Sequence, residues 1–225
     1  GGWGSFDADN THYSLNHIPF ADHGALLDPP TVDVSARCIG MLAQLGYGPD
    51  SEPVRRGVDF LKREQEEDGS WFGRWGTNYI YGTWSALCAL HAAGEDMNAP
   101  YVKKAVEWLK SRQRFDGGWG EDGASYWDER KAESKASTPS QTSWALLGLM
   151  AAGEIDDETV ERGVDYLLNA PRNGAKWDEE YYNAVGFPRV FYLRYHGYSV
   201  FFPIWALSRY RNLRNSNTKN VPYGM

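Results

Sequence analysis

The chain has 225 residues, with 30 acidic against 23 basic side chains and a formal net charge of −7. Its 42% of hydrophobic residues can build a sizeable core, which excludes wholesale disorder. The acidic balance argues against nucleic acid as a partner, because phosphate neutralisation needs a basic face. Two cysteines, Cys38 and Cys88, cannot make a disulfide framework. No apolar run in the sequence reaches the roughly 18 residues of a membrane span.

The sequence repeats itself. Residues 56–61, 104–109 and 162–167 share one pattern of a basic residue, Gly or Ala, Val, an acidic residue, an aromatic residue and Leu. Each copy leads to a tryptophan, and the first two also carry a glutamine six residues before it. These residues are Gln65 and Trp71, Gln113 and Trp119, and Trp177 alone. Trp3, after two glycines, matches the tail of a fourth copy.

Each repeat predicts a helix, a turn that contains glycine, and a second helix. In the first helix of the first copy, Val58 and Leu61 form an apolar stripe at helical spacing. The second helices are more uniformly apolar and rich in Ala and Leu. We expect them near residues 34–45, 84–93, 142–152 and 201–210. Alternating amphipathic and apolar helices indicate an all-α fold, either an α-α barrel or an α-solenoid.

Long connections interrupt the repeats at residues 6–30, 121–137 and 177–189. Loops of this length inside a compact domain are usually functional. Residues 212–225 are polar, and we expect a disordered tail there. Residues 1–211 are then one domain.

The Gln-to-Trp endings are similar to the QW motifs of squalene-hopene cyclases and oxidosqualene cyclases, and we call them QW motifs below. Further segments look like the bacterial squalene-hopene cyclases. They are residues 16–20, 28–30, 70–76, 78–83, 136–142 and 186–188. Because these motifs occur in order up to about residue 211, the chain resembles the C-terminal third of such an enzyme.

The resemblance implies an α-α barrel of the terpene cyclase and prenyltransferase type. We expect the barrel to be incomplete, because about seven to nine helices are too few for a ring of about six helical pairs. The family cyclises squalene to hopene and hopanol without a metal or organic cofactor. An Asp in an Asp-x-Asp-Asp motif protonates a terminal double bond, and a cascade of carbocations closes the rings.

The resemblance also implies where the parent enzyme works and what it binds. Its partners would be squalene, the missing N-terminal part of the same enzyme and one face of the membrane, with a homodimer left open. We expect the parent to be monotopic on the cytoplasmic face of the bacterial inner membrane, and the fragment to be soluble. The net charge of −7 favours attachment through apolar surface over a basic patch.

The sequence contains no Asp-x-Asp-Asp. The nearest match, at residues 7–10, ends in Asn10 and directly follows a QW tail, so we interpret it as part of a loop. In the family the acid lies shortly before the position that corresponds to Gly1. The expectation is a fragment without its proton donor, inactive alone.

Asp33 and Arg37 are four residues apart and would share a helix face. The ordinary interpretation is a surface ion pair that contributes less than about 1 kcal/mol. The resemblance instead places both behind the catalytic acid, and it places Tyr81 where a tyrosine helps to return a proton. Some members carry His where this chain has Arg37. An arginine is permanently charged, so it cannot relay a proton itself.

The resemblance implies an aromatic lining for the cations. Its residues are Phe6, Trp75, Phe187, Phe191, Tyr195 and Tyr198. Aromatic faces attract cations by roughly 0.5 to 2 kcal/mol per contact, and rings offer no nucleophile. The alternative for each ring is ordinary core packing. Phe6 stands where some relatives have Tyr, and Phe20 and Ala21 correspond to the constriction of the substrate channel.

Two other classes of protein remain open at this point. A prenyltransferase β subunit needs zinc held by Asp, Cys and His, yet the five histidines show no ligand spacing, so we expect no metal site. A non-catalytic helical-repeat binding module predicts polar side chains on its concave face. The candidates for that face here are Trp, Phe and Tyr. We interpret the QW residues as structural, because the same helix-end contact recurs in each repeat, whether or not that repeat lies near an active site.

Overall fold

The structure is a computed structural model that describes residues 1–6, 12–19, 27–131 and 136–218. Phe20 and Ala21, the predicted channel residues, lie outside the described residues. The α-helices are α1 (Val32–Gln44), α2 (Glu52–Arg63), α3 (Tyr79–Ala92), α4 (Pro100–Ser111), α5 (Pro139–Ala151), α6 (Glu158–Asn169) and α7 (Tyr198–Arg214). Short 3₁₀ helices are η1 (Tyr13–His17), η3 (Gly123–Tyr126) and η4 (Asp128–Arg130). The strands are β1 (Arg172–Asn173), β2 (Lys176–Trp177), β3 (Ala184–Phe187) and β4 (Phe191–Leu193).

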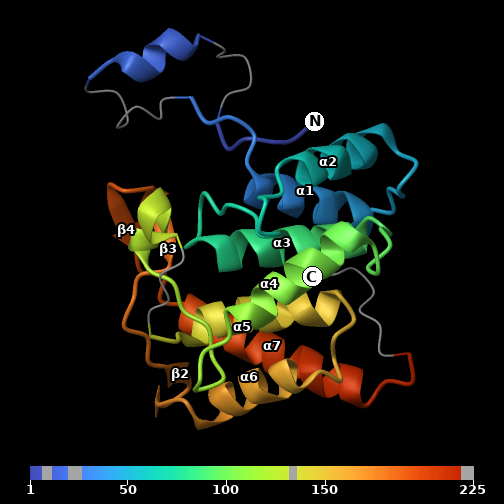
Figure 1. Ribbon diagram of the computed structural model, residues 1–225, viewed down its shortest axis with the longest axis vertical. Coiled ribbons are helices and arrows are strands. Elements are labelled where there is room, and N and C mark those ends of the chain that lie inside the picture. Colours follow the sequence, from blue (N-terminus) through green and yellow to red (C-terminus); the bar gives the residue numbers. More distant parts are fainter. Residues whose placement is uncertain (7–11, 20–26, 132–135, 219–225) are drawn as a thin grey trace.

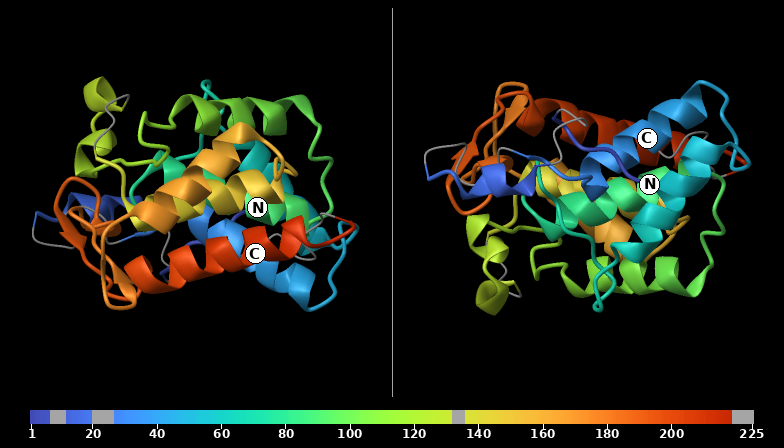
Figure 2. Two further views of the ribbon diagram at one scale, coloured as in Figure 1. Left: turned by 90° about the horizontal axis from the view of Figure 1, so that it is seen from below. Right: turned by 90° about the horizontal axis from the view of Figure 1, so that it is seen from above.

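The helices form an inner and an outer layer, which can be followed in Figures 1 and 2. In the inner layer α1, α3, α5 and α7 pack side by side in that order. In the outer layer α2 packs on α1, α4 packs on α3 and α5, and α6 packs on α5. Inner and outer helices therefore alternate along the chain, as the sequence predicts.

The patterning of apolar residues decides which layer a helix enters. Every residue of α5 is buried, and so are residues 79–90 of α3. In α2 the buried residues lie on one side, with Val54, Val58 and Leu61 among them, and the opposite side is charged. A helix that is apolar all round must be covered on all sides, whereas an amphipathic one can face solvent. The prediction of a mostly helical chain is confirmed.

All four inner helices begin two to five residues before the predicted starts, and two of the boundary differences have a clear physical reason. α3 begins at Tyr79, five residues before the predicted start at 84, because the Glu121 carboxylate accepts from its first backbone N–H groups. α7 continues to Arg214, past residue 212, where we expected a disordered tail to begin. Leu213 is buried on the helical core, which explains the extension.

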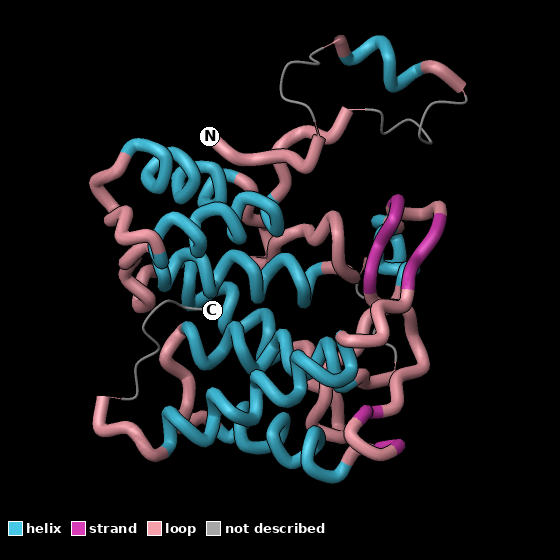
Figure 3. The backbone as a smooth tube through the Cα atoms, turned by 180° about the vertical axis from the view of Figure 1, so that it is seen from behind, coloured by secondary structure: helices cyan, strands magenta, loops and turns pink. Residues whose placement is uncertain are grey.

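The connection at residues 177–189, expected as a loop, contains strand structure. β3 pairs antiparallel with β4, with Ala184 opposite Leu193 and a bulge between Val185 and Phe187. β1 pairs antiparallel with β2 across a turn at Gly174, whose φ of 64° suits glycine. Figure 3 shows that the β3–β4 hairpin lies at one end of the helical layers.

The QW tryptophans Trp71 and Trp119 each connect an outer helix to the next inner helix, and Trp177 and Trp3 each make one of the two contacts. The indole Nε1 donates to the carbonyl ten residues earlier, near the end of the outer helix. The pairs are Trp71 with Leu61 (2.7 Å), Trp119 with Leu109 (2.8 Å) and Trp177 with Leu167 (2.8 Å). The backbone N–H then donates to a hydroxyl on the following inner helix. These pairs are Trp3 with Ser35 (2.8 Å), Trp71 with Thr83 (3.0 Å) and Trp119 with Thr142 (3.0 Å). Trp3 therefore makes the contact expected of a fourth repeat.

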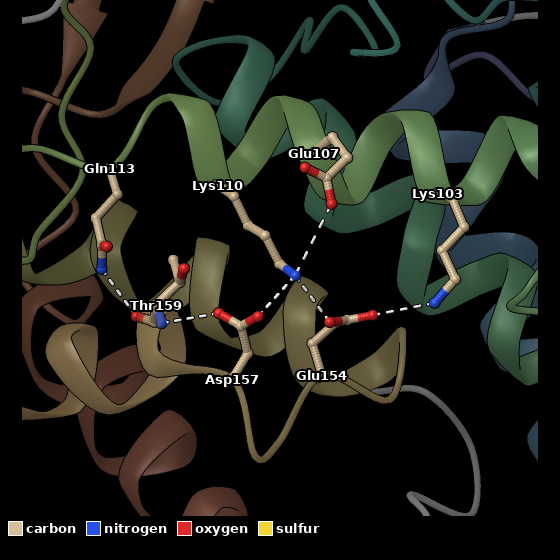
Figure 4. Close-up of polar contacts among 7 residues, drawn as sticks. All are labelled: Lys103, Glu107, Lys110, Gln113, Glu154, Asp157 and Thr159. Atoms are coloured by element: carbon tan, nitrogen blue, oxygen red, sulfur yellow. Dashed lines mark hydrogen bonds and ion pairs between the residues drawn. The ribbon is translucent and has the colours of Figure 1, made fainter.

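The QW glutamines join consecutive outer helices. Gln113 Nε2 donates to the Gly117 carbonyl at 2.9 Å and to the Thr159 carbonyl, at the start of α6, at 2.8 Å (Figure 4). Gln65 makes the same pair of bonds to Gly69 and to Tyr101 at the start of α4, both at 2.9 Å. One amide thus holds both its own turn and the neighbouring helix.

Charged side chains strengthen the same junction between α4 and α6. Lys110 lies 2.9 Å from Glu154 and 2.8 Å from Asp157, and Lys103 lies 3.1 Å from Glu154 (Figure 4). Asp157 also caps α6 by accepting from the Thr159 N–H at 2.8 Å. The lysines lower the pKa values of both carboxyls against the opposing effect of partial burial. A cap and an ion-pair network share one carboxylate, which fixes the start of α6.

We predict that Gln113→Leu lowers the free energy of unfolding by about 1–3 kcal/mol, because two backbone carbonyls lose their donor. Urea unfolding followed by circular dichroism measures the change. Gln44→Leu, at an exposed position at the end of α1, is the control and should stay within about 0.5 kcal/mol of the original chain. Equal effects of the two substitutions would contradict the bridging role of Gln113.

Candidate functional site

The candidate site lies where the inner helices meet the β3–β4 hairpin. The loop before α3 is tied to this hairpin by its backbone: the Val185 N–H donates to the Trp75 carbonyl at 3.1 Å, and the Thr77 N–H donates to the Asn183 carbonyl at 3.0 Å. Gly76 and Ala184 form a β-bridge between them. Residues more than a hundred positions apart in the sequence thereby become neighbours.

Asp33 lies in the first turn of α1 with its side chain buried. Its Oδ2 accepts from the Trp75 N–H at 2.6 Å, and its Oδ1 accepts from the Val34 N–H at 3.1 Å. Burial raises the pKa of the Asp33 carboxyl, and the backbone hydrogen bonds oppose this only in part. The structure thus connects two predicted site residues, Asp33 and Trp75, by a direct hydrogen bond.

Arg37 lies one turn further along α1 and is stacked on an aromatic ring. Its guanidinium carbon is 4.2 Å from the centroid of the Trp84 ring and 5.9 Å from that of Tyr81. Burial raises the pKa of the Tyr81 phenol, and the Arg37 charge opposes the rise. The sequence predicted that Asp33 and Arg37 share a helix face; the structure adds a tryptophan that holds the arginine.

The hairpin carries two of the predicted lining rings. Phe187 in β3 faces Phe191 in β4, with ring centroids 5.5 Å apart in an edge-to-face arrangement. Gly186 is required beside them, because a Cβ there would lie 2.0 Å from the Phe191 ring. Phe191 is 40% exposed in the described chain. The two rings form one unit at the edge of the site.

Phe6 and Trp75 form a second pair of predicted lining rings. Their centroids are 6.0 Å apart at an interplanar angle of 90°. Phe6 is 45% exposed, and it reaches Trp75 from a segment that precedes α1. The pair therefore brings the first long connection of the chain to the hairpin end of the inner layer.

The inner helices supply a ring cluster that the sequence analysis missed. Trp84 of α3 and Trp144 of α5 are fully buried and stacked, with centroids 5.9 Å apart and planes 4° apart. Phe202 of α7 contacts both at 5.4 Å. The predicted residues Tyr81 and Tyr198 pack edge-on against Trp144, at 4.8 Å and 5.7 Å. The sequence did carry a signal for this cluster. Tyr81 and Trp84 are three residues apart and Tyr198 and Phe202 are four apart, so each pair lies on one face of its helix.

Tyr195 lies at the margin of this cluster. Its ring centroid is 5.2 Å from that of Tyr198, and its side chain is 53% exposed in the described chain. The described rings come from the first connection, the loop before α3, the hairpin, the segment after it and the inner helices α3, α5 and α7. They are Phe6, Trp75, Phe187, Phe191, Tyr195, Tyr81, Trp84, Trp144, Tyr198 and Phe202. The predicted lining residues are gathered at one end of the fold.

Two glutamates near the site, the buried Glu121 and the partly buried Glu179, hold helix ends. Glu121 Oε2 accepts from the backbone N–H groups of Asn78 and Ile80 at 3.0 Å and 2.9 Å. Glu179 Oε1 accepts from the Ser140 N–H at 2.6 Å, at the start of α5. Burial raises the pKa of both carboxyls, and the backbone bonds oppose this. Their geometry is that of carboxylate caps at helix N-termini, where negative charge is favoured.

The described residues show neither a metal-ligand cluster nor a membrane-spanning helix. Within these residues no cluster of three or more His, Cys, Asp or Glu side chains is placed to hold a metal ion. No helix in the described part of the chain is both long and apolar enough to cross a bilayer.

Residues 1–212 match a family model described as the squalene-hopene cyclase C-terminal domain. The chain belongs to the squalene-hopene cyclase family. The resemblance inferred from the QW motifs is thereby confirmed. The chain is not assigned to the two alternative classes, a prenyltransferase β subunit or an unrelated helical-repeat binding module.

Individual relatives give the same result. The chain is 63% identical over 219 residues to a probable squalene-hopene cyclase of Sinorhizobium fredii, covering 96% of this chain and 34% of that protein. It is 60% identical to the squalene-hopene cyclase of Bradyrhizobium diazoefficiens, over 100% of this chain and 34% of that protein. The squalene-hopene cyclase of Alicyclobacillus acidocaldarius is 50% identical, over 94% of this chain and 33% of that protein. The chain therefore spans about a third of the length of these squalene-hopene cyclases.

Solved structures support the architecture. The type II terpene cyclase MstE from Scytonema, in complex with geranylgeranyl dihydroxybenzoate, superposes with a TM-score of 0.63 at 17% identity, over 94% of this chain and 63% of that one. The same cyclase in complex with merosterolic acid A superposes with a TM-score of 0.62 at 20% identity, over 92% of this chain and 61% of that one. At this identity the likeness shows the fold alone, and it confirms the predicted α-α barrel type.

We predict that Asp33→Asn changes the pH dependence of stability. Because the folded pKa of Asp33 lies above its ordinary value of 3.8, the folded state favours the protonated form, and the Asp33 contribution is lost as pH rises from 3.8 through the folded pKa. The amide keeps an acceptor for the Trp75 N–H and cannot ionise. The Asn variant should therefore gain stability relative to the original chain as pH rises, by about 1.4 kcal/mol for each unit of the shift.

Urea unfolding measured at several pH values between 3 and 8 gives this difference directly. Asp59→Asn, at an exposed position on α2, is the control and should show a difference within about 0.5 kcal/mol at every pH. A difference for Asp33→Asn that stays constant with pH would show that the buried carboxyl is not destabilised in its charged form.

Proposed function

We propose that this chain works as the C-terminal part of a squalene-hopene cyclase, which converts squalene to hopene and hopanol. The observation that carries the proposal is the family match over residues 1–212. The gathering of the predicted site residues at one end of the fold supports it. Asp33 holds Trp75 by a hydrogen bond, and Tyr81 and Tyr198 pack on Trp144.

In this proposal the reaction begins when an Asp-x-Asp-Asp acid protonates a terminal double bond of squalene. The 225 residues contain no such motif, so the acid comes from another part of the enzyme. Asp33 and Arg37 lie behind it, and Tyr81 helps to return the proton. A buried carboxyl and a nearby permanent cation can separate the pKa values of two neighbouring acids, which an acid catalyst requires. Tyr81 stays a neutral phenol, because burial raises its pKa.

The rings then stabilise the carbocations. A carbocation needs surroundings that attract positive charge and hold no nucleophile, and the faces of Trp75, Phe187 and Phe191 meet both conditions. Each ring contact supplies roughly 0.5 to 2 kcal/mol, so several rings in sequence can guide a cation along the folded chain. The final cation loses a proton to give hopene or gains water to give hopanol.

The proposed function also implies a substrate, a location and binding partners. The substrate is the polyene squalene, and no metal or organic cofactor takes part. The remaining part of the enzyme packs against this chain and completes the barrel. The parent is a monotopic protein on the cytoplasmic face of the bacterial inner membrane, where squalene enters from the bilayer past Phe20 and Ala21. A homodimer stays a prediction.

We predict that the full-length enzyme converts squalene to hopene and hopanol and that the 225-residue chain alone does not, because the chain lacks the acid motif. Gas chromatography of the products, with both proteins in detergent or lipid vesicles, tests both halves. A full-length enzyme that leaves squalene unchanged would refute the activity. Turnover by the 225-residue chain would refute the requirement for an acid outside it.

We predict that Phe187→Ala in the full-length enzyme yields prematurely terminated, partly cyclised products, because an intermediate cation loses its stabilising ring. A loss of up to about 2 kcal/mol corresponds to a slowing of the affected step by about 30-fold. The matched control is Phe115→Ala, since Phe115 is 89% exposed in a turn of the outer layer. An unchanged product distribution for Phe187→Ala would count against its cavity role.

A further inference from the structure

A buried ion pair lies beside the predicted lining rings and has no part in the mechanism above. Arg74 Nε is 3.6 Å from Asp28 Oδ1, and the two side chains are 8% and 3% exposed. Removing two charges from water costs several kcal/mol per ion before their attraction offsets it. A buried ion pair of this kind is therefore weak evidence for a role in stability. Its other contacts indicate a different role.

The contacts of Arg74 lead to two of the lining rings. Its Nη1 donates to the Gly186 carbonyl at 3.0 Å, directly before Phe187. Its guanidinium carbon is 4.1 Å from the Trp75 ring centroid and 5.4 Å from that of Phe187. One planar cation therefore contacts both rings and holds the backbone of β3, across 112 positions of sequence.

The contacts of Asp28 lead to a third ring. Its Oδ2 accepts from the Ser5 N–H at 3.0 Å, directly before Phe6. The Phe6 ring in turn meets Trp75 edge-on, at 6.0 Å. The ion pair thus holds the backbone beside Phe6, Trp75 and Phe187, which come from three separate segments of the chain.

We propose that Arg74 and Asp28 are positioning residues that set the relative placement of Phe6, Trp75 and Phe187 in the cation-lining site; this rests on the function proposed above. The guanidinium occupies one face of Trp75 and leaves the other for the substrate. Asp28 neutralises the arginine, so that no net positive charge behind the ring repels a carbocation in front of it. The planar fork of arginine matters, because it stacks on a ring and donates to a carbonyl at the same time.

The experiment compares Arg74→Met, Arg74→Lys and Asp28→Asn in the full-length enzyme. Arg56→Met is the control, because Arg56 forms an exposed ion pair with Glu52 on α2. We expect kcat/KM for squalene to fall at least about 10-fold in Arg74→Met, with a larger share of partly cyclised products. Arg74→Lys should not restore the product distribution, because lysine keeps the charge and loses the fork. The control should match the original enzyme in rate and products.

A second measurement reports on Trp75 without turnover. The protein is labelled with 5-fluorotryptophan, and the Trp75 resonance is assigned with Trp75→Phe. We expect this resonance to shift or broaden in Arg74→Lys and Asp28→Asn, while that of Trp177 stays in place. These variants keep the charge or the volume of the original side chain, so they serve where Arg74→Met fails to fold.

The outcomes separate the two proposals. An original enzyme that does not convert squalene refutes the proposed function, and the fluorine resonance of Trp75 then decides alone whether the ion pair fixes this ring. An active enzyme whose Arg74 and Asp28 variants keep the product distribution and the Trp75 resonance of the control overturns the inference. A loss of rate with unchanged products and an unchanged resonance overturns it as well, since a general loss of stability would explain that result.

Discussion

The fold depends on one hydrogen bond that recurs at Trp71, Trp119 and Trp177, from the indole of the QW tryptophan to the carbonyl near the end of its outer helix. In the second copy Trp119 donates to Leu109 at 2.8 Å, and its backbone N–H donates to Thr142 on the next inner helix at 3.0 Å. The bond satisfies a carbonyl that a helix end otherwise leaves without a partner. It also fixes where the chain crosses from the outer to the inner layer. Every loop that reaches the candidate site starts from such a crossing.

The two most deeply buried inner helices, α3 and α5, carry their polar contacts at the helix ends. They have no exposed side on which charge could lie, so their first backbone N–H groups need acceptors, which Glu121 and Glu179 supply from the loops after two QW tryptophans. Asp33 occupies the first turn of α1 at the same end of the layer and accepts from the Trp75 loop. Burial raises the pKa of all three carboxyls. The buried and partly buried carboxyls therefore lie at the ends of the inner helices, on the side of the candidate site.

The sequence predicted what local patterns encode. Apolar periodicity predicted the inner and outer helices, and the spacing of Gln113 and Trp119 predicted a structural junction, because these contacts lie within one repeat or between neighbours. It did not predict the β3–β4 hairpin or the contact of Arg74 with Gly186, since 112 residues separate those two and no periodicity links them. Phe187 and Trp75 were named through the family resemblance; that a single arginine contacts both is a property of the folded chain. Trp84 and Trp144 carried a signal in their helical spacing, but only the structure shows that they stack.

Two of the arginines that lie on the faces of tryptophans are at the candidate site, and they differ in what surrounds the guanidinium. Arg74 is 4.1 Å from the Trp75 ring and is paired with the buried carboxylate of Asp28, so a cation on the opposite face meets a nearly neutral pair. Arg37 is 4.2 Å from the Trp84 ring and lies beside Tyr81, whose phenol stays neutral because burial raises its pKa. In both cases a guanidinium holds one face of a tryptophan ring, and the ring belongs to a segment that reaches the candidate site.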